Sequence, residues 1–149
     1  MNTKGHNLLL ADDDEDDCDF FKEALEELNV PFSLKTVNDG VQLMDFLKNV
    51  PAENLPDILF LDLNMPRKNG TECLGEIKQH PKLQNLPVII FSTSLDTNIV
   101  NIMYQGGAVY YIRKPGDYTK LKKVIEKAVA LIPINNLERP ERENFVIES

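Results

Sequence analysis

The chain has 149 residues, 42% hydrophobic and 27% charged, which is enough for one domain with a buried core and too few for two. Its net charge of −8 argues against a nucleic-acid-binding surface, which needs clustered Lys and Arg. No N-terminal apolar stretch resembles a signal peptide and no run approaches the roughly 18 apolar residues of a membrane span, so we expect a soluble cytoplasmic protein with no membrane partner.

The first half of the chain alternates apolar runs with amphipathic stretches. Leu8 to Ala11 is typical of a strand covered on both faces, and it ends in the acidic run of residues 12–17. From Asp17, apolar residues at three-to-four spacing predict an amphipathic helix. Further elements are predicted as a strand at 32–37, a short helix at 41–47 and a strand at 58–61.

The second half continues the same alternation. A helix is predicted around residues 73–80, then a strand at 88–91 that ends in Ser92. Asp96 can cap the next helix, which carries the apolar residues Ile99, Ile102 and Met103. A fifth strand at 109–112 leads into Lys114-Pro115, and a final amphipathic helix begins near Asp117.

Five strands alternating with five helices predict an α/β fold, a doubly wound parallel sheet with helices on both faces. Ligands of such sheets bind beyond the carboxyl ends of the strands. The side chains expected at that edge are those that follow the first, third, fourth and fifth strands, namely Asp12, Asp13, Asp62, Ser92 and Lys114. Each has an ordinary alternative role as a strand-end or surface residue, but their convergence on one edge favours a functional site.

A cation site is expected among these acids. A calcium loop starting at Asp12 would place acids at its first, third, fifth and twelfth positions, but its sixth position is Asp17 where the sharp turn needs glycine. Magnesium fits better, since it uses one or two carboxylates and takes further oxygens from water and phosphate. The two cysteines, Cys18 and Cys73, lack the spacing of a zinc site and are expected to be reduced thiols.

As a set, these residues resemble the receiver domain of bacterial two-component response regulators, from about Asn7 to Ile132. The resemblance implies a flavodoxin-like sheet with strand order 2-1-3-4-5. The sequences of residues 62–66, 87–90 and 92–94 are similar to those of single-domain regulators that partner phytochrome-type histidine kinases. On this basis residues 1–132 are a receiver domain, and residues 133–149 are a polar tail with no output domain.

The resemblance also implies roles for the residues at the sheet edge. Asp62 would be the nucleophile that accepts a phosphoryl group from a kinase phosphohistidine. Mg²⁺ would be held by Asp13, Asp62 and the backbone carbonyl of Asn64, with Asp12 acting through an outer-shell water or hydrogen bond. The Lys114 ammonium would meet the charge on the transferring group.

A conformational switch is implied as well. In the family, a hydroxyl after the fourth strand moves toward the phosphate and an aromatic residue on the fifth strand follows it inward; those positions are Ser92 and Tyr111, although sequence does not fix the direction of the Tyr111 side chain. Asn64 and Ser94 occupy positions that tune phosphate lifetime, and Thr93 stands where many relatives have a smaller residue. The expected partners are a sensor histidine kinase, phytochrome-type or hybrid, and a second copy bound through the face of the fourth helix, fifth strand and fifth helix.

Three other functions remain alternatives. A phosphatase of the haloacid-dehalogenase type also uses a strand-end aspartate with magnesium, but it needs a second Asp where this chain has Asn64. A pseudo-receiver that binds partners without phosphorylation is disfavoured by the intact acids and Lys114. A flavodoxin-like small-molecule binder is disfavoured because no glycine-rich phosphate loop follows the first strand.

Overall fold

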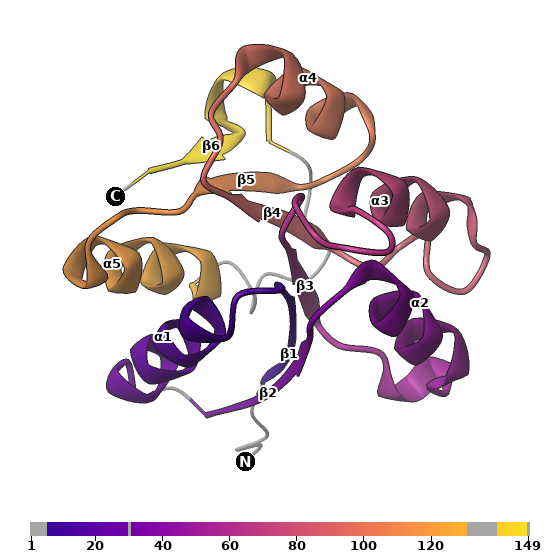
Figure 1. The fold of residues 1–149 in the computed structure, drawn as a ribbon, viewed down its shortest axis with the longest axis horizontal. Coiled ribbons are helices and arrows are strands. Elements are labelled where there is room, and N and C mark those ends of the chain that lie inside the picture. Colours follow the sequence, from indigo (N-terminus) through magenta and orange to yellow (C-terminus); the bar gives the residue numbers. More distant parts are fainter. Residues whose placement is uncertain (1–5, 30, 131–139, 149) are drawn as a thin grey trace.

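The structure, a computed structural model, describes residues 6–29, 31–130 and 140–148. Helices and strands alternate along the chain (Figure 1). The strands are β1 (His6–Ala11), β2 (Phe32–Val37), β3 (Ile58–Leu61), β4 (Val88–Ser92), β5 (Tyr110–Arg113) and β6 (Val146–Ile147). The helices are α1 (Glu15–Glu27), α2 (Gly40–Asn49), α3 (Gly70–Gln79), α4 (Thr97–Gln105) and α5 (Tyr118–Val129), with short 3-10 turns η1 (Ala52–Asn54) and η2 (Arg142–Asn144).

All strands of the sheet are parallel and follow the order β2-β1-β3-β4-β5-β6. This confirms the doubly wound α/β fold and the predicted order of the first five strands. The prediction of five strands was one short, since β6 adds to the outer edge of β5. A strand of two residues gives no periodic signal, and β6 forms only because β5 offers it a pairing edge.

The sheet separates two apolar cores. α1 and α5 cover one face, and α2, α3 and α4 cover the other (Figure 1). Successive residues of β1 alternate between them, because Leu8 and Leu10 pack with α1 and α5 while Leu9 and Ala11 pack on the opposite side. Burial on both faces explains why the central strands read as continuous apolar runs.

Side-chain caps fix where several helices begin. Asp96 caps α4 as predicted, and Asp117, near which the last helix was predicted to begin, caps α5; both accept hydrogen bonds from backbone N–H groups of the first turn. α1 begins at Glu15, two residues before the predicted start, because Asp14 accepts hydrogen bonds from the N–H groups of Asp16 and Asp17. The acidic run is therefore divided between the end of β1 and the first turn of α1.

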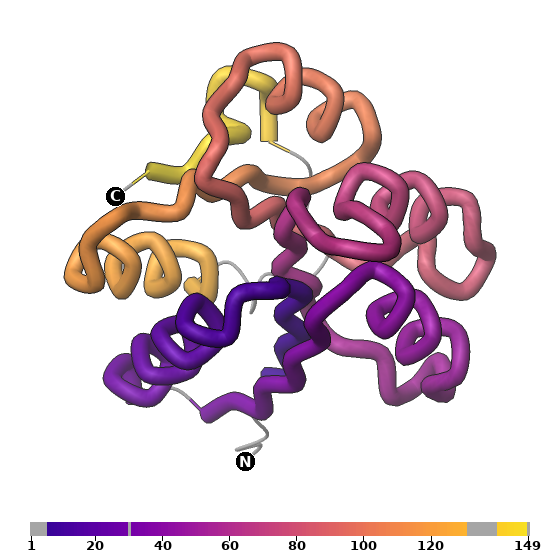
Figure 2. The backbone as a smooth tube through the Cα atoms, in the orientation of Figure 1, coloured from indigo at the N-terminus to yellow at the C-terminus, as the bar shows by residue number. Residues whose placement is uncertain are grey.

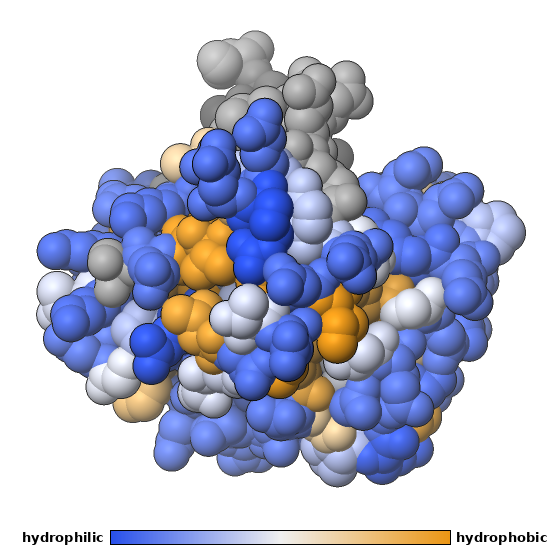
Figure 3. All heavy atoms as spheres, turned by 90° about the horizontal axis from the view of Figure 1, so that it is seen from above, coloured by the Kyte–Doolittle hydropathy of each residue, from blue (hydrophilic) through white to orange (hydrophobic). Residues whose placement is uncertain are grey.

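One face of the molecule is predominantly polar. The face shown in Figure 3 is largely hydrophilic, and its apolar areas are separated by polar side chains. Large apolar side chains that are at least one-third exposed, among the residues described, are Phe20, Leu95 and Ile102. None of the described helices combines the length and the apolar character required to cross a bilayer.

Candidate phosphoacceptor site

Three carboxylates meet at the carboxyl end of the sheet. Asp12 and Asp13 follow β1, and Asp62 follows β3; these strands are neighbours, with Ala11 in register with Leu61. One oxygen from each carboxylate lies within 4.8 Å of the others. Asp12 and Asp62 are buried, whereas Asp13 is exposed. The topology thus brings together the acids that the sequence places at strand ends.

Lys114 supplies the positive charge of this edge. Its ammonium donates hydrogen bonds to Asp12 Oδ2 at 2.7 Å and to Asp17 Oδ2 at 2.9 Å, and lies 3.7 Å from Asp62 Oδ2. Its backbone N–H donates to Ser92 O at 2.8 Å, which ties the ends of β4 and β5 together. The side chain is only 9% exposed, so its ion pairs are largely shielded from water.

Asp17 is a member of this site that the sequence did not single out. It lies in the first turn of α1, and the resemblance assigns it no role. The six consecutive acids of residues 12–17 gave no means of choosing which side chain faces the sheet edge. That choice depends on the start of α1, which the Asp14 cap determines.

The cluster has an excess of negative charge, because the Lys114 ammonium pairs with Asp12, Asp17 and Asp62 and the carboxylate of Asp13 lies beside Asp12 and Asp62. Burial raises the pKa of Asp62 to about 7, and the charge of Asp12 adds to the rise although Lys114 opposes it. Burial raises the pKa of Asp12 as well. For Lys114, burial acts to lower the pKa, but the hydrogen bond to Asp12 and the charge of Asp62 outweigh it and the pKa rises.

These residues fit a divalent cation that prefers oxygen ligands. Clustered carboxylates with uncompensated charge are the donor set that Mg²⁺ uses in proteins. A calcium loop does not fit, since Asp14, its third ligand position, instead caps α1. The other predicted ligand, the backbone carbonyl of Asn64, stays a prediction.

The loop after Asp62 folds back tightly on the strand end. The Asn64 N–H lies 3.4 Å from Asp62 Oδ1, and the Gly70 N–H donates to Leu63 O at 2.9 Å. A Cβ at position 70 would stand 2.4 Å from the Asp62 carbonyl oxygen, so only glycine permits this approach. The Asn64 side chain is exposed, and the loop keeps the Asn64 backbone beside Asp62.

Ser92 and Tyr111, the predicted switch residues, are both buried. Ser92 Oγ accepts a hydrogen bond from the Ser94 N–H at 3.2 Å. The Tyr111 side chain points inward, which sequence could not establish, and its hydroxyl donates to Ser94 O at 2.6 Å. Burial raises the pKa of Tyr111, against the effect of hydrogen bonds with Ser92 and Ser94. The tyrosine is therefore bound to the loop that begins with Ser92.

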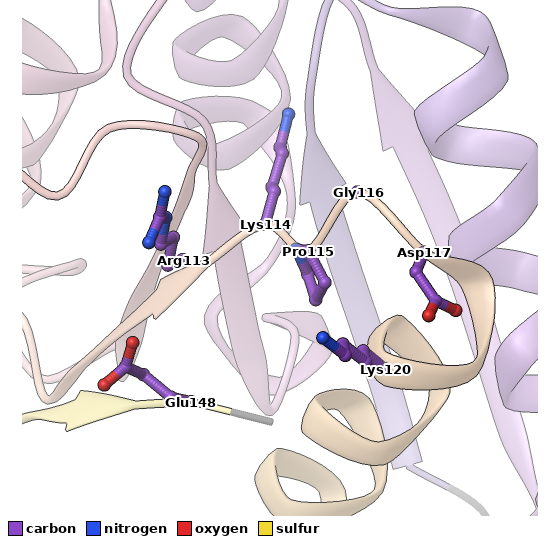
Figure 4. A pocket seen from close by; sticks show the side chains of 7 residues that line it. All are labelled: Arg113, Lys114, Pro115, Gly116, Asp117, Lys120 and Glu148. Atoms are coloured by element: carbon purple, nitrogen blue, oxygen red, sulfur yellow. The ribbon is translucent and has the colours of Figure 1, made fainter.

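A separate cavity of about 440 Å³ lies on the other side of the β5–α5 connection. Arg113, Asp117, Lys120 and Glu148 contribute to its lining (Figure 4). The Lys114 side chain extends away from Lys120 and Glu148 in this view. Lys114 also contributes to the lining, but Asp12, Asp13 and Asp62 do not, so the cavity adjoins the carboxylate cluster without including its acids.

Comparison with known proteins identifies the family of this chain. The family model described as "Response regulator receiver domain" matches residues 8–126. The chain belongs to this family. Aspartate phosphorylation and magnesium binding are characteristic of receiver domains, and a receiver domain is a signalling module of two-component systems.

The similar proteins include the response regulators Rcp1 and RcpA. The chain is 33% identical to Response regulator Rcp1 of Synechocystis sp. over 122 residues, covering 80% of this chain and 83% of Rcp1. The crystal structure of the phosphorylated cyanobacterial phytochrome response regulator RcpA has a TM-score of 0.76 and 32% identity, covering 83% of this chain and 91% of RcpA. The Mn²⁺-bound form of Rcp1 has a TM-score of 0.76 and 30% identity, covering 91% of this chain and 99% of Rcp1. The receiver domain is thus homologous to single-domain response regulators.

Proposed function

We propose that Asp62 is the phosphoacceptor of this receiver domain. The observation that supports this best is its position: it is the buried strand-end carboxylate that lies next to two further acids and 3.7 Å from the Lys114 ammonium. An acid alone at this edge would have no group to hold the phosphoryl oxygens, and a lysine alone would have no nucleophile.

In the proposed reaction, a carboxylate oxygen of Asp62 attacks the phosphorus of a phosphohistidine. The new O–P bond forms as the N–P bond breaks, and the imidazole nitrogen keeps the electron pair of the broken bond. The Lys114 ammonium turns from its carboxylate partners toward the phosphoryl oxygens and stabilises their charge. Ser92 contributes its hydroxyl to the same oxygens.

Mg²⁺ is the cation proposed for this reaction. Asp13, Asp62 and the Asn64 carbonyl would hold it, with Asp12 acting through a water or a hydrogen bond. When bound, it supplies charge neutralisation at the phosphoryl oxygens. The Mn²⁺-bound form of Rcp1 supports a divalent ion in a relative, and the oxygen donors of this cluster support magnesium here.

The proposed partners are proteins. A sensor histidine kinase, of the phytochrome-type or hybrid class, would donate the phosphoryl group; RcpA, a phytochrome response regulator, supports this choice. Homodimerisation would use the face of α4, β5 and α5. Since β6 pairs with the outer edge of β5, a second copy would meet α4, β6 and α5, including Ile102, which is 52% exposed.

Other parts of the proposal follow from composition and cysteine state. We expect no nucleic-acid partner because the net charge is −8. We expect action in the cytoplasm, where thiols stay reduced, since Cys18 and Cys73 are both free and buried. We also expect turnover limited to self-catalysed phosphorylation and dephosphorylation of Asp62, with residues 1–132 as the receiver domain.

The decisive experiment is intact-mass spectrometry after incubation with Mg²⁺ and a small acyl phosphate. We expect one added phosphoryl group in the wild type and none in Asp62→Asn. Asp45→Asn is the matched control, because Asp45 is an exposed acid on α2. Modification that persists in Asp62→Asn, or its absence in the wild type with every phosphodonor including histidine kinases, would refute the assignment.

A further inference from the structure

The C-terminal segment, defined here as residues 140–148, packs on the outer edge of the sheet beside α4. Its strand β6 runs parallel to β5, with Val146 in register with Tyr111 and Ile147 with Ile112. Figure 2 shows this stretch of chain, in yellow, lying along the end of the molecule beside α4. The segment lies beyond the residues that the family model matches, which end at 126.

Phe145 anchors the segment. Its side chain is fully buried and packs in the core shared with α2, α3 and α4. Its ring makes edge contacts with Tyr104, at a centroid distance of 5.0 Å, and with Tyr111, at 6.3 Å. Nearby, Arg142 Nε donates a hydrogen bond to Asn101 Oδ1 at 2.7 Å. The Phe145 ring thus contacts both α4 and β5, alongside the Arg142–Asn101 hydrogen bond and the pairing of β6 with β5.

Phe145 also holds the backbone of Tyr111, whose N–H donates to Phe145 O at 3.0 Å. At its other end, Tyr111 is hydrogen-bonded through its hydroxyl to Ser94 O at 2.6 Å. Tyr111 therefore spans the distance between the C-terminal segment and the loop that follows Ser92. Among the described residues of the C-terminal segment, Phe145 is the one whose ring contacts the Tyr111 ring.

We propose that Phe145 is a positioning residue of the phosphoacceptor site: by packing on Tyr111 it keeps that side chain inward and fixes the Ser92–Asp96 loop. Docking of the C-terminal segment and occupancy of Asp62 then favour each other, because a coupling between two sites acts equally in both directions. The coupling rests on the proposed function, whereas the positioning role of Phe145 does not.

A buried side chain with only a structural role would predict something different. Removing it would lower the stability of the whole domain without a selective effect on the loop after β4. Leu25 on α1 serves as the matched control, since it is equally buried but belongs to the opposite core. Phe145→Leu is the conservative variant, which refills most of the space beside Tyr111.

The first measurement is amide hydrogen exchange of the metal-free protein, resolved by peptide mass spectrometry. We expect Phe145→Ala to accelerate exchange of residues 92–96 by about tenfold relative to the strand β1, as for a coupling of ordinary size. Phe145→Leu should restore protection, and Leu25→Ala should affect both regions alike. Arg142→Gln is the second variant, in case Phe145→Ala fails to fold. It loosens the segment without opening a cavity, and it should also accelerate exchange of residues 92–96.

The second measurement adds Mg²⁺ and beryllofluoride, a stable phosphoryl mimic. We expect slower exchange in residues 140–148 of the wild type, and about tenfold weaker beryllofluoride binding by Phe145→Ala. Unchanged exchange of residues 92–96 in both Phe145→Ala and Arg142→Gln would overturn the positioning role. If the wild type binds no beryllofluoride and takes up no phosphoryl group, the proposed function fails, but the metal-free exchange still decides the role of Phe145.

Discussion

Asp62→Asn should make the metal-free protein more stable, although it removes the proposed nucleophile. Asp62 is buried beside Asp12, and its pKa lies at about 7 instead of the usual 3.8. The folded state therefore holds the proton of Asp62 more tightly than the unfolded state does. Proton binding by Asp62 therefore contributes to the free energy of unfolding. This contribution is fully present below about pH 4 and is lost as the pH rises through about 7, because the fold disfavours the ionised carboxylate. Asparagine keeps the shape and has no such cost.

The size of the effect follows from the two pKa values. Their difference corresponds to about 4 kcal/mol if nothing relaxes. Movement of Lys114 and the coupling between Asp62 and Asp12 reduce this cost, so we expect Asp62→Asn to raise the free energy of unfolding by about 2 kcal/mol near pH 8. For a domain of this size, that corresponds to an increase in Tm of about 5 °C. Near pH 5 the gain should be much smaller, because Asp62 is then protonated in the folded state.

Urea unfolding followed by circular dichroism, repeated across this pH range, measures the effect directly. Asp45→Asn is the control, and its difference from wild type should not depend on pH. Saturating Mg²⁺ should stabilise the wild type and have less effect on Asp62→Asn, which lacks one proposed ligand. If Asp62→Asn were less stable than wild type at pH 8 without metal, or if its gain were independent of pH, the argument from crowded carboxylates would be refuted.

Three further predictions concern stability and accessibility. Lys114→Met should lower the free energy of unfolding in urea by about 3 kcal/mol, because it leaves buried carboxylates without their cation. A loss below about 1 kcal/mol would contradict this. Gly40→Ala should lower Tm by several degrees, as its Cβ would lie 2.0 Å from Lys68 O, and an unchanged Tm would contradict that packing. Burial raises the pKa of Cys18 to about 12 and of Cys73 to about 11, so a thiol reagent near neutral pH should label both only after unfolding; rapid labelling of the native protein would show that these sites open.

The parts of the fold that sequence predicted are those set by local pattern. Continuous apolar runs marked the central strands, and the residue after each run placed Asp62 and Lys114 at one edge. Caps could be predicted where one candidate stood alone, as with Asp96. In the acidic run, by contrast, Asp14 competed with identical neighbours, and only the folded chain showed that it caps α1 and turns Asp17 toward Lys114.

Features set by tertiary contact were beyond prediction from sequence. Tyr110 and Tyr111 are adjacent on a strand covered on both sides, so alternation could not tell which one faces the Ser92 loop. Phe145 begins a short apolar patch in a polar stretch, and no local rule indicated that it would be fully buried. Both residues take their positions from the same contact between β5 and the C-terminal segment.

The contact between β5 and the C-terminal segment is small, so a change at the phosphoacceptor site can alter it. Phe145 is the only fully buried side chain among residues 140–148, while Val146 and Ile147 remain partly exposed. An edge element with one fully buried side chain opens at a lower free energy than the central strands. An equilibrium near balance responds to a coupling of about 1–3 kcal/mol, whereas a deeply stable element does not. A signal from Asp62 through Tyr111 would therefore change the docking of the C-terminal segment before it disturbed any other strand.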